Sequence, residues 1–218
     1  MSAPKARLIE AAIRLIADGG PQALQARKLA AEVGSSTMTV YTHFGGMPGL
    51  VDELAREGFR RLDANLAALG ETEDPVADIA ALGMAYRRTA IENPTLYAVA
   101  FGQITFPATT STKAPAAGAD EAIASFEHLL SATRRAIDAG RFRRGPAHTA
   151  AAQLWSALHG YVTIESSGFF GDQGIEEVLA HLAVTLAVGL GDTVEAAERS
   201  VRAIRLNALP GTPPTVVR

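Results

Sequence analysis

The 218-residue sequence contains no cysteine, which excludes a disulfide framework, a thiolate metal site and a thiol nucleophile. Aromatic residues make up only 6% of the chain, and runs of β-branched residues typical of strands are few. The longest charge-free windows, Asn93–Thr112 and Gly145–Ile164, are broken by proline, glycine and threonine, unlike a membrane span. Charges interrupt the apolar stretch near the N-terminus, unlike a secretory signal, so we expect a cytoplasmic protein.

Alanine and leucine, both good helix formers, are abundant and recur at helical spacing. Glycine or proline follows most of these segments, as at Gly19-Gly20-Pro21, and marks their ends. The predicted helices cover about 5–17, 26–33, 37–44, 47–69, 75–92, 94–102, 119–139, 147–167, 174–189 and 192–206. The predicted fold class is therefore all-α.

The chain is expected to have three parts. Residues 1–50 form a three-helix head, residues 51–206 a helical bundle, and residues 207–218, rich in proline, a disordered tail. Within the bundle, residues 103–118 are rich in Thr, Pro, Ala and Ser and are predicted to form a surface loop. Residues 1–48 carry a net charge of +2 in a chain of net charge −3, which permits contact with a polyanion at that end without requiring it.

The head has the pattern of a helix-turn-helix, three short helices with a glycine turn between the second and the third. Gly34 suits a sharp left-handed turn, and the Ser36 hydroxyl is expected to cap the third helix. The expected small core of the head consists of Leu29, Ala30, Val33, Val40 and Phe44. The side chains left to face solvent are Thr37, Met38, Tyr41, Thr42 and His43.

An exposed helix of this kind fits the major groove of B-DNA. Threonine hydroxyls and methyls and the Met38 thioether suit base edges, whereas Tyr41 and His43 suit phosphate oxygens. Each residue also has a structural interpretation, since Tyr41 alone is typical of a packing aromatic and His43 of a solvated surface histidine.

The run Thr39-Val40-Tyr41-Thr42-His43-Phe44, after a glycine turn and a serine, resembles the DNA-binding domain of the tetracycline-repressor (TetR) family. The similarity covers roughly residues 5–54. It implies a homodimeric transcriptional regulator, a repressor, that binds a palindromic operator in double-stranded DNA and is released by a small apolar or amphipathic ligand. The DNA-binding residues that it implies are Arg27, Ser36, Thr37, Met38, Thr39, Tyr41, Thr42 and His43.

Two positions depart from the family pattern. Met47-Pro48 stands where many members have a lysine at the start of the fourth helix, and Gln25 stands where many have a serine or threonine cap. We therefore expect weaker anchoring of phosphate.

The bundle carries a second resemblance. Residues 153–160 resemble a subclass of TetR C-terminal domains marked by Trp-x-x-x-His-Gly, and in this family that part of the chain dimerises and binds the small ligand. The candidate pocket residues, which could equally fill a helical core, are Met84, Tyr97, Phe101, Phe126, Trp155 and His159. Two late helices are apolar on more than one side and favour a symmetric four-helix interface between two copies. The residues expected there are Leu154, Leu158, Tyr161, Leu179, Leu182 and Leu186.

Other functions are less favoured by the sequence. An enzyme is not expected, because the chain has no Gly-x-Ser-x-Gly, no phosphate loop and no paired-histidine metal motif, and no cofactor is predicted. Glu177 and His181 lie four residues apart, but two ligands are too few for a metal site. The alternative is a helical ligand-binding or interaction module that has lost specific DNA binding, for which Met47-Pro48 is the only indication.

Overall fold

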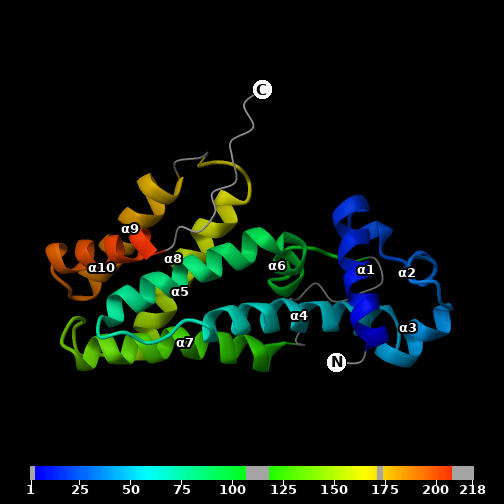
Figure 1. Cartoon of the computed structure of the whole chain (residues 1–218), viewed down its shortest axis with the longest axis horizontal. Coiled ribbons are helices and arrows are strands. Elements are labelled where there is room, and N and C mark those ends of the chain that lie inside the picture. The colour runs from blue at the N-terminus through cyan, green and yellow to red at the C-terminus, as the bar shows by residue number, and fades with distance from the viewer. Residues whose placement is uncertain (1–2, 107–117, 171–173, 208–218) are drawn as a thin grey trace. The chain divides into compact units, whose positions relative to one another are not determined.

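The computed structural model describes residues 3–106, 118–170 and 174–207 (Figure 1). Across these ranges the chain is helical and has no strand, which confirms the all-α prediction. The elements are α1 Ala3–Gly19, η1 Pro21–Ala23, α2 Ala26–Glu32, α3 Thr37–Phe44, α4 Met47–Ala67, α5 Pro75–Glu92, α6 Pro94–Ala100, α7 Ala119–Asp138, α8 Ala147–Glu165, η2 Ile175–Leu179, α9 Ala180–Leu190 and α10 Val194–Asn207. In the described ranges, no helix combines the length and the apolar character that crossing a membrane requires.

The helices agree with the predicted segments to within a few residues, and two details were not predicted. A short 3₁₀ turn, η1, follows α1. The predicted helix over 174–189 is not uniform, because residues Ile175–Leu179 form a π-helical stretch before α9 begins.

The chain divides into two compact units. Unit 1 comprises Met1–Asn65 and Arg88–Ser125, and unit 2 comprises Leu66–Arg87 and Phe126–Arg218. The sequence-based division into 1–50, 51–206 and 207–218 stays a prediction. Residues 107–117 of the expected loop and residues 208–218 of the expected tail lie outside the described residues.

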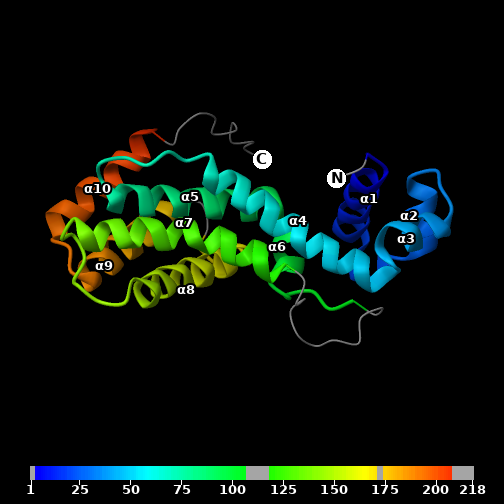
Figure 2. The ribbon, with the colours of Figure 1, turned by 90° about the horizontal axis from the view of Figure 1, so that it is seen from below.

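One hydrophobic core holds unit 1 together. Apolar side chains from α1, α2, α3, α4 and α6 meet in it, and α1, α2 and α3 lie side by side in both ribbon views (Figures 1 and 2). Gly58 allows α6 to approach α4 closely, because a Cβ there would lie 3.1 Å from the Leu96 carbonyl oxygen. Phe106 also enters this core and is only 3% exposed, whereas Gln103 and Thr105, at the described start of the expected surface loop, are exposed.

Unit 2 is built from most of α5 and of α7, together with α8 to α10. Its core cluster includes Phe142, Leu154 and Ala197, and α9 lies beside α10 (Figure 2). Ion pairs connect the ends of three helices. The guanidinium of Arg141, after α7, bonds Asp74 before α5 and Asp192 before α10. On α10, Arg199 and Arg202 are exposed.

Candidate nucleic-acid interface

The turn between α2 and α3 is a tight helix-ending motif. The Gly34 N–H donates to the Ala31 carbonyl at 3.1 Å, and the Ser35 N–H donates to the Ala30 carbonyl at 2.8 Å. Gly34 has φ +67°, a left-handed conformation that only glycine adopts at little cost. The sequence thus fixes the sharp change of direction that separates α3 from α2.

The inner side of α3 anchors it to the core of unit 1. Val40 is fully buried together with Leu29, and Phe44 and Val33 pack partly against the same cluster, as the sequence predicts. At the other end, a Cβ on Gly49 of α4 would lie 1.9 Å from the Phe44 carbonyl oxygen. The start of α4 therefore packs against the last turn of α3 without room for a side chain at that position.

The outer side of α3 presents the side chains that the sequence predicted to be exposed. Met38 is 68% and Tyr41 55% exposed, and Thr37 and Thr42 are exposed as well. His43 is only half-buried rather than fully outward, because it lies in the last turn with its ring edge toward Phe44. Thr39, also expected at the interface, is half-buried. The result is a short amphipathic helix with an accessible polar and thioether face.

Two hydroxyl groups behave differently from the expectation. Ser36 occupies the N-cap position of α3 with extended backbone angles, but its side chain makes no capping hydrogen bond. Its backbone carbonyl accepts from the Thr39 N–H at 3.0 Å instead, so the exposed hydroxyl is not engaged in capping. The Thr42 hydroxyl donates to the Met38 carbonyl at 2.9 Å, which leaves its oxygen as an acceptor.

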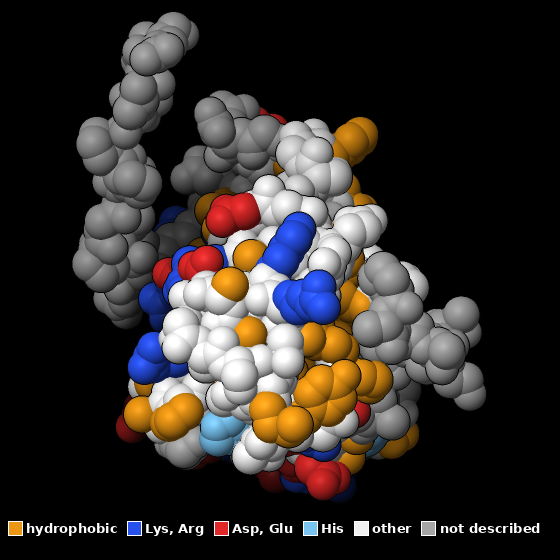
Figure 3. Space-filling view, turned by 90° about the vertical axis from the view of Figure 1, so that its right-hand side faces the viewer, with side chains coloured by type: hydrophobic (Ala, Val, Ile, Leu, Met, Phe, Trp, Pro, Cys, Tyr) orange, Lys and Arg blue, Asp and Glu red, His pale blue; other side chains and the backbone are white. Residues whose placement is uncertain are grey.

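Most cationic groups of the head are engaged within the chain. The Lys5 ammonium lies 3.0 Å from Glu53, and Arg14 lies 3.5 Å from Glu32. Among the described residues, exposed Arg27 and Lys28 of α2 have no ion-pair partner. The face viewed in Figure 3 accordingly shows separate Lys and Arg side chains among polar and hydrophobic ones, not one continuous basic patch.

Sequence reasoning missed one residue that holds the turn. The Arg7 guanidinium of α1 donates to the Val33 carbonyl at the end of α2, at 3.0 Å. The two residues are 26 positions apart, and no spacing rule connects an exposed arginine with a distant backbone carbonyl. Arg7 therefore acts as a positioning residue for the turn.

The start of α4 shows what the departure at Met47-Pro48 means. Met47 packs partly against the core of unit 1, and Pro48 is exposed. Neither side chain can donate a hydrogen bond to phosphate. Gln25 at the N-cap of α2 makes no capping bond either, since its amide nitrogen donates to the Gln22 carbonyl at 3.1 Å.

The candidate pocket residues belong to both units and are described unit by unit. In unit 1, Tyr97 and Phe101 pack with ring centroids 4.7 Å apart. In unit 2, Phe126 and Trp155 meet edge to face at 6.1 Å, and Trp155 lies 5.8 Å from the His159 ring. The remaining candidate, Met84, is half-buried in α5.

His159 has a defined environment inside unit 2. Its Nδ1 lies 2.9 Å from the hydroxyl oxygen of Tyr86, a residue that is only 4% exposed. Burial lowers the pKa of His159 below its ordinary value, which favours the neutral ring. Nearby, burial and the charge of Glu165 raise the pKa of Tyr161 to about 12.

The residues expected between two copies differ in their accessibility within a single chain. Leu154, Tyr161 and Leu179 are buried within the chain itself, whereas Leu158, Leu182 and Leu186 are half-buried. Leu154 belongs to the core of unit 2. A role for these six residues between chains stays a prediction.

Comparison with known proteins identifies both parts of the chain. Residues 8–54 match the model of bacterial regulatory proteins of the tetR family, and residues 79–187 match that of tetracyclin repressor-like C-terminal domains. The Trp-x-x-x-His-Gly subclass is not addressed by these matches and stays a prediction. A comparison with curated proteins gives no match.

Solved structures with the same fold cover nearly the whole chain. A protein of unknown function from Rhodococcus sp. RHA1 is 26% identical, with a TM-score of 0.74 over 88% of this chain and 97% of that one. The TetR family transcriptional regulator PfmR from Thermus thermophilus is 19% identical, with a TM-score of 0.58 over 91% and 96%. RolR in complex with resorcinol is 17% identical, with a TM-score of 0.60 over 91% and 92%. With the helix-turn-helix geometry and the two family matches taken together, the chain belongs to the TetR family and is a TetR-like DNA-binding transcriptional regulator.

Proposed function

We propose that the protein is a homodimeric repressor that binds a palindromic operator through α3 and leaves it when a small molecule binds in the helical body. The observation that carries the proposal is that α3 packs against the core of unit 1 on one side and is exposed on the other. Met38 and Tyr41 point to solvent while Val40 is fully buried. One side of α3 therefore packs against the core and the other side is free to enter the major groove.

The individual contacts follow from the chemistry of that face. Threonine groups and the Met38 thioether meet base edges, and Tyr41, His43 and Arg27 meet phosphates. Ser36 joins these contacts with a hydroxyl that does not cap the helix. Arg27 and Lys28 of α2 are exposed and have no ion-pair partner among the described residues, so both are available to bind phosphate. Two such cations provide only modest anchoring of the DNA backbone.

The proposed ligand is small and apolar or amphipathic. RolR, which has this fold, has been solved in complex with resorcinol, a small aromatic molecule. In this chain the aromatic group of Phe126, Trp155 and His159 supplies ring faces and a neutral imidazole in one place. A useful coupling between ligand and operator amounts to about 1–3 kcal/mol.

The decisive experiment is selection of duplex DNA from a random pool by the full-length protein at physiological salt. We expect enrichment of a palindrome whose half-sites are centred about one helical turn, roughly 10 base pairs, apart. If no sequence is enriched, the protein is instead a helical ligand-binding or interaction module. If a single half-site without symmetry is enriched, the proposal of a dimer on the operator is overturned.

A substitution at Tyr41 tests the docking of α3. The Tyr41 ring lies against Gly46, and Tyr41→Phe keeps the ring while it removes the hydroxyl proposed to bind phosphate. We expect affinity for the selected operator and for random duplex to fall alike, by about fivefold to tenfold, since one hydrogen bond to a charged group is lost. Tyr97→Phe in α6 is the matched control. Unchanged affinity of the Tyr41 variant in a fluorescence-anisotropy titration would argue against this docking.

A further inference from the structure

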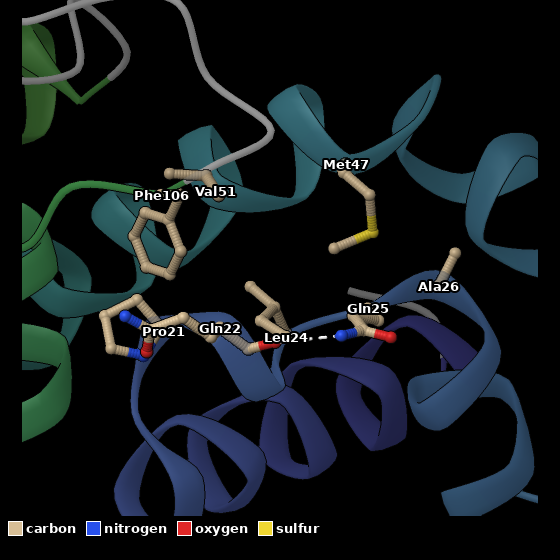
Figure 4. A pocket seen from close by; sticks show the side chains of 8 residues that line it. All are labelled: Pro21, Gln22, Leu24, Gln25, Ala26, Met47, Val51 and Phe106. Atoms are coloured by element: carbon tan, nitrogen blue, oxygen red, sulfur yellow. Dashed lines mark hydrogen bonds between the residues drawn. The ribbon is translucent and has the colours of Figure 1, made fainter.

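Unit 1 contains an open pocket between α4 and the segment that leads from η1 into α2 (Figure 4). Its volume is about 500 Å³, within the range of small-molecule sites. The lining comes from η1, the start of α2, α4 and the segment after α6. The residues that line it are Pro21, Gln22, Leu24, Gln25, Ala26, Met47, Val51 and Phe106.

The lining defines the chemistry of a ligand. Figure 4 shows the side chains of Leu24, Met47 and Phe106 converging on the space between α4 and the η1–α2 segment. Six of the eight lining residues are apolar, the other two are Gln22 and Gln25, and none is charged. The side-chain nitrogen of Gln25 uses one donor on the Gln22 carbonyl, and a primary amide offers a second donor and an oxygen acceptor. This combination suits a neutral molecule with an apolar ring and one amide-like polar end.

The pocket is well placed to affect DNA binding. Gln25 is the N-cap of α2, and Met47 begins α4 immediately after the glycines that end α3. Both walls of the pocket therefore belong to segments that hold the helix-turn-helix in its place. Leu24, Val51 and Phe106 are also members of the core cluster that contains Val40.

We propose that this pocket binds a small neutral amphipathic molecule of the aromatic-amide type. Binding of this molecule shifts the position of α2 and α3 relative to α4. The site is separate from the ligand site proposed in the helical body. The second part of the proposal, an effect on DNA affinity, rests on the proposed function, whereas binding itself does not.

The binding step can be measured on the full-length protein with benzamide as the probe. Methionines labelled with carbon-13 at the methyl group report on Met47 in the pocket, on exposed Met38 and on Met84 of unit 2. We expect benzamide to shift the Met47 signal, assigned with Met47→Leu, saturably and more than the signals of the other methionines. No saturable shift, or equal shifts of all the methionine signals, overturns the proposal.

A pair of variants on α2 ties the response to the pocket. Ala26→Leu adds volume to the lining, whereas Ala31→Leu places the same side chain at an exposed position of the same helix. We expect Ala26→Leu to abolish the shift of the Met47 signal and Ala31→Leu to retain it. Retention of the shift in both variants places benzamide elsewhere and contradicts the assignment.

The regulatory step uses the operator obtained by selection. Saturating benzamide is expected to weaken operator binding of the wild-type protein by at least about fivefold. It is expected to leave operator binding of the Ala26→Leu variant unchanged. A saturable shift of Met47 without any change in DNA affinity overturns the regulatory part alone. Failure to select any operator overturns the proposed function and leaves the Met47 result to decide the pocket.

Discussion

At the scale of single residues, three glycines determine where α3 begins and ends and how closely α4 packs against it. Gly34 provides a left-handed turn before α3, and Gly45, with φ +71°, ends it in the same conformation. Gly49 then allows α4 to pass against the Phe44 carbonyl. These glycines do not contact the proposed operator, but they determine the direction in which Met38 and Tyr41 point.

Gly49→Ala is expected to destabilise the protein by about 2–4 kcal/mol, because the backbones of α3 and α4 must separate to admit the methyl group. Gly83→Ala in α5 is the matched control, since its Cβ would meet Leu158 at an ordinary 3.8 Å. That control is expected to be neutral or stabilising by up to about 1 kcal/mol. Urea unfolding of both variants measures the difference, and equal stabilities would contradict the contact at Phe44.

At the scale of helices, Arg61 of α4 joins three elements of unit 1. Its guanidinium bonds Glu57 within α4 at 2.9 Å, Glu10 of α1, and the Asn93 side chain before α6 at 2.9 Å. Burial lowers the pKa of Arg61, but the hydrogen bond with Glu57 and the charge of Glu10 outweigh it, so the pKa is raised overall. Arg61 thus links the first helix of the head to the segment that leads into α6.

Arg61→Met is expected to lower the free energy of unfolding by about 1 kcal/mol, because the pairs are partly exposed and only part of their attraction survives screening. Arg134→Met serves as the control. Its ion pair with Glu127 is 3.6 Å long and more than half exposed, so the expected loss is below about 0.5 kcal/mol. Chemical denaturation at low and high salt compares them. An Arg61 variant no less stable than the control would mean that these ion pairs add no stability.

At the scale of the whole molecule, the charged carboxylate of Asp74 makes stability depend on pH. Burial raises the pKa of Asp74, but the Ser200 hydroxyl at 2.6 Å, the Ala77 N–H and Arg141 together lower it below its ordinary value. A lowered pKa in the folded state means that the charged carboxylate stabilises the fold. This contribution is complete above the ordinary pKa of the carboxyl group and is lost as the pH falls through the lowered one.

Acidification below about pH 4 is therefore expected to destabilise the protein, and Ser200→Ala should reduce that dependence. Without the hydroxyl, the folded-state pKa of Asp74 rises toward its ordinary value. The variant is expected to lose about 1–2 kcal/mol at pH 7 and proportionally less on acidification. Urea unfolding at pH 7, 4 and 3 tests this, with Ser156→Ala on the exposed side of α8 as the control. A parallel pH profile for wild type and Ser200→Ala would refute the role of the hydroxyl.

The proposed dimerisation also belongs to the scale of the whole molecule. Leu182 of α9 is half-buried in one chain, and Leu182→Glu would place a charge in the proposed interface. We expect the variant to sediment as a monomer and to lose about 100-fold or more in operator affinity, because the two heads then bind independently. Val194→Glu, at a 49% exposed position of α10, is expected to leave both properties unchanged. A Leu182 variant that still sediments as a dimer would move the interface elsewhere.

The sequence alone determined the properties that depend on neighbours along the chain. Apolar spacing and glycine or proline at the ends specified the helices, and the run from Thr39 to Phe44 specified the helix-turn-helix, because each depends on local geometry. Tertiary structure decided the rest. Only packing shows that Phe106 is buried and that Arg7 holds the turn after α2. These features depend on side chains distant in sequence, whose meeting is set by the shape of the core and not by any local pattern.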